Sequence, residues 1–165
     1  METIPKIVNR RNCSPEEIEW LRAYLAENAK PVWLYVCGLI REDPRITKGG
    51  VSGTKEIGEL KTVWSTLGNI PNSRKFFVRE VIHILQDRQN ENHNKAEEHL
   101  QKIEDYMKLL DKGELQLIIT LEESKNDLMI LDGNTRTVAY FEYGMKRGHL
   151  HQILPVYVIS SKCTF

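Results

Sequence analysis

The residues whose types and spacing could support chemistry lie in one short segment, Asp132-Gly-Asn-Thr-Arg136. An aspartate can accept a proton or bind a metal ion, and an arginine can direct two parallel hydrogen bonds at a phosphate or carboxylate. Asn134 and Thr135 are typical of a helix start, because short polar side chains accept hydrogen bonds from the N–H groups of the first turn. We predict that Gly133 to Arg136 bind a phosphate and that Asp132 is a catalytic carboxylate and a magnesium ligand.

The residues on either side of this segment predict a strand before it and a helix after it. Leu128 to Leu131 form an apolar run, and the helix should begin at Asn134 and end between Gly144 and Gly148. A strand that leads through Asp-Gly into a helix brings free N–H groups and the positive end of the helix dipole to one point, which favours an anion. The plainer interpretation is an Asp-Gly turn followed by a helix cap and a surface arginine. The apolar face of the helix should comprise Val138, Phe141 and Met145.

Further β segments flank this strand–helix unit. Leu115 to Leu121 and Leu154 to Ile159 are rich in β-branched and apolar residues, as strands are. A polar turn is expected from Glu122 to Asp127. Two groups outside the motif could contribute to the site. Glu122 is a second candidate catalytic carboxylate, with a plain turn residue as the alternative, and His149 and His151 follow the predicted helix and could support the site.

The order of these elements resembles the ParB/sulfiredoxin superfamily over roughly residues 76–160. The resemblance implies a small mixed β-sheet flanked by helices, with a nucleotide (ATP, ADP or CTP) and Mg²⁺ bound at the Gly-x-x-Arg helix start. The second partner would be a small-molecule acceptor or DNA. The superfamily includes partition proteins that bind CTP and DNA, sulfiredoxins, a free-serine kinase and phosphorothioation-linked DNA-binding proteins. The matching residues are Gln116–Glu122, Ile130–Arg136, Ala139, Gly144 and Leu154–Ile159.

Two departures from the family patterns narrow this resemblance. Sulfiredoxins carry their nucleophilic cysteine directly after the motif glycine and before a histidine, where this chain has Asn134 and Thr135. An amide cannot attack a sulfinyl phosphate, so we exclude sulfiredoxin chemistry and expect no cysteine to be required. Partition proteins carry a helix-turn-helix domain and a dimerisation tail downstream, and we expect a chain that ends at Phe165 to lack them.

The composition favours a soluble protein of neutral charge. The 165 residues contain 23 basic and 23 acidic side chains, so there is no global basic field to hold a nucleic acid. Three widely spaced cysteines argue against a metal knuckle. The N-terminus does not have the form of a secretory signal peptide, and the longest apolar stretch, 31–40, is about half a membrane span. We expect a cytoplasmic protein with no membrane partner; the oligomeric state stays open.

The N-terminal half is predicted to be an α/β extension, residues 1–73, packed on a ParB/sulfiredoxin-like domain, residues 74–165. Ser14-Pro-Glu-Glu17 is a strong helix start, and Pro31 should end this helix. The next expected elements are a strand at 32–40, a loop at 41–53 and a helix at about 54–67. The ambiguous segment 75–85 is expected to begin as a strand, and it precedes a loop at 86–94 and a helix at about 95–110. The glycine-rich turn at 49–53 fails the P-loop pattern, so it is either a connector or a source of N–H donors.

Three functions fit these features. The first is a nucleotide-dependent phosphotransferase or phosphohydrolase that uses Asp132 and Arg136. The second is a non-enzymatic regulator associated with a nucleotide or DNA in plasmid, phage or defence biology. The third is a ParB-like nuclease, although the sequence contains no dense carboxylate cluster for metal-dependent cleavage.

Overall fold

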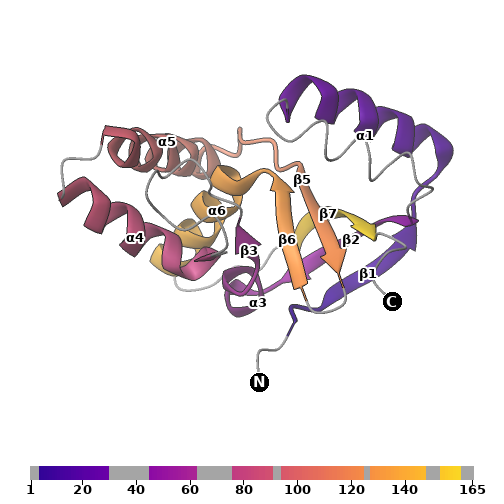
Figure 1. The fold of residues 1–165 in the computed structure, drawn as a ribbon, viewed down its shortest axis with the longest axis horizontal. Coiled ribbons are helices and arrows are strands. Elements are labelled where there is room, and N and C mark those ends of the chain that lie inside the picture. Colours follow the sequence, from indigo (N-terminus) through magenta and orange to yellow (C-terminus); the bar gives the residue numbers. More distant parts are fainter. Residues whose placement is uncertain are drawn as a thin grey trace.

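A seven-stranded mixed sheet with helices on both faces forms the structure, a computed structural model (Figure 1). It describes residues 4–29, 45–62, 76–90, 94–124, 127–147 and 153–160. Its sheet order is β1-β2-β7-β5-β6-β3-β4. The strands are β1 (Ile7–Asn12), β2 (Arg45–Ser52), β3 (Lys61–Thr62), β4 (Phe76–Phe77), β5 (Ile119–Ser124), β6 (Asp127–Asp132) and β7 (Ile153–Ser160); the helices are α1 (Pro15–Asn28), α3 (Thr54–Gly58), α4 (Val78–Asn90), α5 (Asn94–Asp111) and α6 (Asn134–Arg147). The predicted mixed α/β class is therefore confirmed.

The sheet has a separate hydrophobic cluster on each face. Helices α4, α5 and α6 gather on one side of the sheet, and α1 lies alone on the other (Figure 1). Alternate residues of one strand point to opposite faces, so β2, β6 and β7 contribute residues to both clusters. The larger cluster includes Leu85, Ile103, Leu121, Ile130, Val138 and Val156. The cluster beneath α1 comprises Leu21, Leu25, Ala29, Ile46, Leu131 and Ile159.

The elements around the predicted motif form largely as expected. The strand predicted at 128–131 is β6, the helix predicted from Asn134 is α6, and the strand predicted at 154–159 is β7. The helix predicted at about 95–110 is α5. The strand expected at 115–121 instead begins at Ile119 and continues to Ser124, so the prediction of a turn at Glu122 is wrong. Glu122 is buried in β5, where it pairs with Met129 of β6.

The loop predicted at 41–53 is wrong from Arg45 onward, because Arg45–Ser52 forms β2 between β1 and β7. The sequence predicts a loop because the segment is rich in glycine, which is typical of loops. An added Cβ on Gly49 would lie 2.6 Å from Ile7 Cγ2, and one on Gly50 would lie 2.0 Å from Ile153 Cγ2. Glycine in a strand can mark a close approach by a neighbouring segment, which is its role here.

Two helix limits also differ from the prediction. The helix predicted at 54–67 ends at Gly58 as α3, and Lys61–Thr62 pairs with β6 as β3. The segment at 75–85 begins as the two-residue strand β4 and then becomes α4, which continues through the expected loop as far as Asn90. In the helical part, the apolar residues Val78, Val81 and Leu85 have helical spacing and pack in the larger cluster.

The N-terminal and C-terminal segments share one sheet, since β2 pairs with β7 along its whole length and β3 pairs with β6. The boundary expected at 73/74 and the strand expected at 32–40 lie outside the described residues. No helix in the described part of the chain is long and apolar enough to cross a bilayer.

Candidate functional site

The chemistry-bearing segment forms the junction between β6 and α6, residues Asp132–Arg136, which we call the β6–α6 junction. Asp132 ends β6 and Asn134 begins α6. Gly133 between them has φ +94°, and an added Cβ there would lie 2.6 Å from Ile119 Cδ1. The Gly133 carbonyl accepts hydrogen bonds from both the backbone N–H and the hydroxyl of Thr137, at 2.9 and 2.7 Å. Glycine is therefore required at this turn by conformation and by space.

An irregularity in β6 turns Asp132 toward α1. Thr120 lies opposite Asp132, whereas Leu121 lies opposite Ile130, so β6 contains one extra residue, Leu131. Without this bulge, alternation would place Asp132 on the same face as Ile130, beneath the helix layer. With it, Asp132 shares the face of Thr120, because directly opposed residues of an antiparallel pair point the same way.

Asp132 and Arg136 form an ion pair one helical turn apart. Arg136 donates from Nη2 to Asp132 Oδ2 at 3.0 Å and from Nη1 to the Tyr24 hydroxyl of α1 at 2.8 Å. The Asp132 and Arg136 side chains are only 12% and 16% exposed. Burial raises the pKa of Asp132 above its ordinary value, and this effect exceeds the opposing effects of Arg136 and of the Gly133 backbone N–H.

Two buried side-chain oxygens at this place have no hydrogen-bond partner among the described residues. They are Thr120 Oγ1, on a residue with no exposed surface, and Asn134 Oδ1. Thr120 lies opposite Asp132 and beside Tyr157 of β7, which packs beneath α1. Buried polar atoms are nearly always hydrogen-bonded in folded proteins, so these two oxygens are available to accept a hydrogen bond from a water or a ligand. The junction thus combines a buried charge pair, a helix start and two polar atoms that no described residue hydrogen-bonds.

Glu122, the other predicted catalytic carboxylate, lies on the same face but not beside Asp132. It is two residues from Thr120 along β5, about 7 Å by the rise of a strand, and its neighbour in β7 is Ile159 beneath α1. Thr135 lies in the first turn of α6 and is partly exposed. His149 and His151 fall outside the described residues.

The described residues contain no group of three or more His, Cys, Asp or Glu side chains that could hold a metal ion. If Asp132 binds a metal ion, at most one other side chain of these types among the described residues would share that ion. This fits magnesium, which commonly binds one or two carboxylates and takes its remaining ligands from water and substrate phosphates.

Sequence reasoning missed Tyr24 and Thr120. Tyr24 lies beside the apolar stripe of α1, and helical spacing alone does not show that its hydroxyl reaches an arginine 112 positions later in the chain. Thr120 stands within an apolar strand, where a single threonine is unremarkable. Only the pairing of β5 with β6 brings it to Asp132.

We compared the chain with known proteins, and no family model, curated protein or solved structure matches it. The functional argument therefore depends on the geometry of the β6–α6 junction.

Proposed function

We propose that this protein is a ParB/sulfiredoxin-like nucleotide-binding protein. In this proposal, the β6–α6 junction binds the phosphates, and the terminal phosphoryl group passes to an acceptor hydroxyl or to water. The observation that carries the proposal is the buried Asp132–Arg136 pair at a helix start. Next to it lie the side-chain oxygens of Thr120 and Asn134, which have no hydrogen-bond partner in the described part of the chain. The order of strand, Asp-Gly-x-x-Arg and helix supports it, because the superfamily binds nucleotide phosphates at this helix start.

Phosphate binding would use groups that the fold already directs at one point. The first-turn N–H groups of α6 have no partners within the helix and lie at the positive end of its dipole. Arg136 would turn at least one guanidinium nitrogen from Asp132 to a phosphate oxygen, and Thr135 and the Asn134 amide would add donors. Tyr24 would keep the guanidinium in place through its bond to Nη1.

This exchange of partners would activate Asp132. A buried carboxylate that loses its cationic partner binds a proton more strongly, since burial disfavours the charged form. Asp132 would then take the proton of the acceptor hydroxyl as its oxygen attacks phosphorus. The bond from phosphorus to the leaving oxygen would break, and the shortened nucleotide would carry away that electron pair. Magnesium, when bound, would offset charge on the phosphates; in the alternative role, Asp132 would hold that ion and would not act as the base.

The first test measures phosphate binding through Arg136. ATP, ADP, CTP and GTP are titrated into the protein by calorimetry, with and without magnesium. Replacing Arg136 with alanine removes a charge-assisted hydrogen bond, so we expect affinity for the nucleotide that binds to fall roughly 10- to 100-fold. Arg147→Ala is the matched control, because Arg147 is an exposed arginine at the far end of α6 that pairs with Asp111. Equal affinity in wild type and a folded Arg136→Ala variant would contradict the proposal.

Turnover separates the enzyme from the binding-only alternative. Phosphate release and transfer are measured in wild type, in Asp132→Asn and in a variant with all three cysteines changed to serine. The proposed mechanism requires loss of activity in Asp132→Asn and retained activity in the cysteine variant. Nucleotide that binds but is never turned over by the wild type would favour the regulator.

A further inference from the structure

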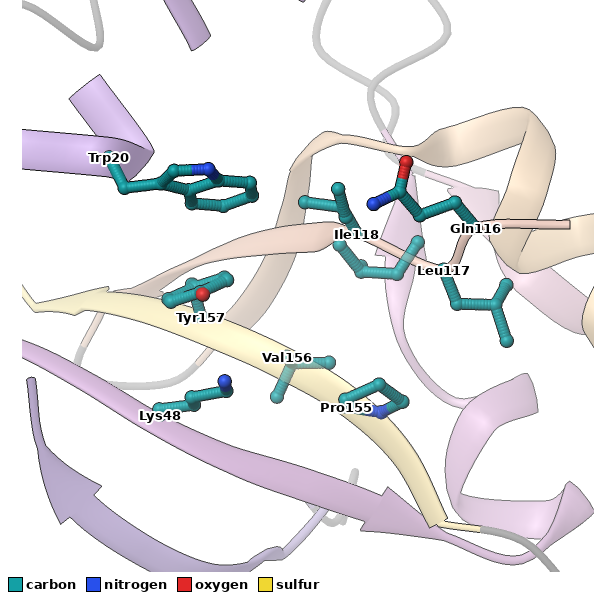
Figure 2. Close-up of a pocket in the computed structure, with 9 residues that line it drawn as sticks. Trp20, Lys48, Gln116, Leu117, Ile118, Pro155, Val156 and Tyr157 are labelled. Carbon is teal, nitrogen blue, oxygen red and sulfur yellow. The ribbon is translucent and has the colours of Figure 1, made fainter. Parts of the chain in front are cut away.

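A cavity lies beside the β6–α6 junction on the α1 face of the sheet. Its volume is about 180 Å³, and Figure 2 shows it between α1 and the segment that enters β5. Trp20 of α1 forms one wall and residues 116–119 form the opposite wall. Residues 155–157 of β7 and Lys48 of β2 complete the lining. The four contributing segments are far apart in sequence, so the cavity exists only in the folded chain.

Aromatic rings dominate one end of this cavity. Trp20 lies 6.0 Å from Tyr157 between ring centroids, and it also stacks on Tyr24 at 5.3 Å and 14°. Trp20 is nevertheless 44% exposed, an unusual position for a large aromatic side chain. The exposed part of the Trp20 side chain borders the cavity and is available for contact with a planar ligand.

Two polar side chains border the same space. The Gln116 amide is directed across the cavity toward Trp20 (Figure 2). The Lys48 ammonium lies 5.3 Å from the centre of the Tyr157 ring. A lysine donates hydrogen bonds only, whereas an amide both donates and accepts. Together they suit a flat heterocycle with hydrogen-bonding groups at its edge.

Two contacts connect the residues that line the cavity with the β6–α6 junction. The carbonyl oxygen of Ile118, which lines the cavity, lies 3.1 Å from the position of a Cβ added to Gly133. The Trp20–Tyr24 ring pair also joins them, because Tyr24 accepts the hydrogen bond from Arg136. A ligand with a ring in the cavity would thus have its attached groups next to the start of α6.

We propose that this cavity is the base subsite of the nucleotide, with the base packed against the Trp20 and Tyr157 side chains that line it and its edge hydrogen-bonded by Gln116 and Lys48. This inference rests on the proposed nucleotide function and adds the part of the ligand that the junction does not bind. Pockets that enclose a drug-sized ligand measure roughly 300–1,000 Å³. The smaller volume here suits one ring system and leaves the phosphates outside, at the junction.

The test separates recognition of the base from recognition of the phosphates. Calorimetry compares CTP and ATP with inorganic tripolyphosphate, which has no base, and with the nucleosides cytidine and adenosine, which have no phosphate. Loss of this aromatic contact in Trp20→Ala should weaken binding of the preferred nucleotide roughly 5- to 100-fold. Its affinity for tripolyphosphate should not change, and Trp20→Phe should retain most of the nucleotide affinity. Met145→Ala is the matched control, since Met145 is another exposed apolar side chain.

Each other outcome counts against a defined claim. If nucleotide and tripolyphosphate bind equally well, or if Trp20→Ala affects neither or both alike, the base subsite is wrong and the phosphate site stands. If a nucleoside binds through Trp20 but tripolyphosphate does not bind, the ring pocket stands and the proposed phosphate function is wrong. If none of these ligands binds, both proposals are wrong.

Discussion

At Asp132, burial and a neighbouring cation act on one carboxyl group in opposite directions. The carboxylate loses most of its contact with water beneath α1, which favours the protonated form, while Arg136 favours the ionised form. Burial is the larger effect, so the pKa is raised although the group is ion-paired. A carboxyl group in this state is a better proton acceptor than an exposed aspartate.

This balance predicts the pH dependence of stability. The folded state holds the Asp132 proton more tightly than the unfolded state, so ionisation opposes folding. As pH rises from below the ordinary value of 3.8 through the higher folded-state pKa, wild type should lose stability relative to Asp132→Asn. Urea unfolding of both proteins across this range measures the difference. The opposite trend, with wild type gaining relative stability as pH rises, would mean that the Arg136 ion pair outweighs burial.

At the scale of elements, the β6–α6 junction depends on a turn that only glycine fits. Gly133 has a positive φ, and a side chain there would also press on Ile119 and on the Ile118 carbonyl. Gly113, which follows α5, has φ +70° but no atom within 4 Å of an added Cβ. Substitutions at the two glycines therefore measure the effect of backbone strain separately from the effect of steric crowding.

We expect Gly113→Ala to cost about 1–2 kcal/mol of unfolding free energy, the strain of a left-handed residue. Gly133→Ala should cost about 1–3 kcal/mol more, because overpacking is added to the same strain. Chemical denaturation of the two variants gives both values. Equal losses would show that the surroundings of Gly133 yield easily and that the junction is less tightly packed than the distances indicate.

For the whole molecule, one sheet includes strands from both the predicted N-terminal extension and the predicted C-terminal domain. All eight residues of β2 pair with β7, and α1 covers Leu131 and Ile159 from the C-terminal segment. Removing residues 1–73 would leave one long edge of β7 unpaired and the cluster beneath α1 open to water.

A fragment of residues 74–165 should therefore fail to fold by itself. We expect no cooperative unfolding transition by circular dichroism, whereas the full chain should show a single transition that coincides by fluorescence and by circular dichroism. A fragment with a cooperative transition of its own would identify the C-terminal segment as an independent domain.

Sequence alone determined the features that depend on residues within about one helical turn of each other. Ser14 and Glu17 cap α1 reciprocally, as their spacing predicts, and the change from an apolar run to Asp-Gly and then to helical spacing correctly located β6 and α6. These are local effects of backbone hydrogen bonding and side-chain periodicity. The candidate phosphate site could be located for the same reason.

Tertiary structure decided everything that depends on which strands lie side by side. In the sequence, the glycines of β2 are typical of a loop. Only the packing of β1 and β7 against them shows that they belong to a strand. The bulge that turns Asp132 toward α1, the contact of Tyr24 with Arg136 and the burial of Thr120 all follow from strand register and helix placement. Periodicity in one segment carries no information about its distant partners, because those contacts are selected by the packing of the whole chain.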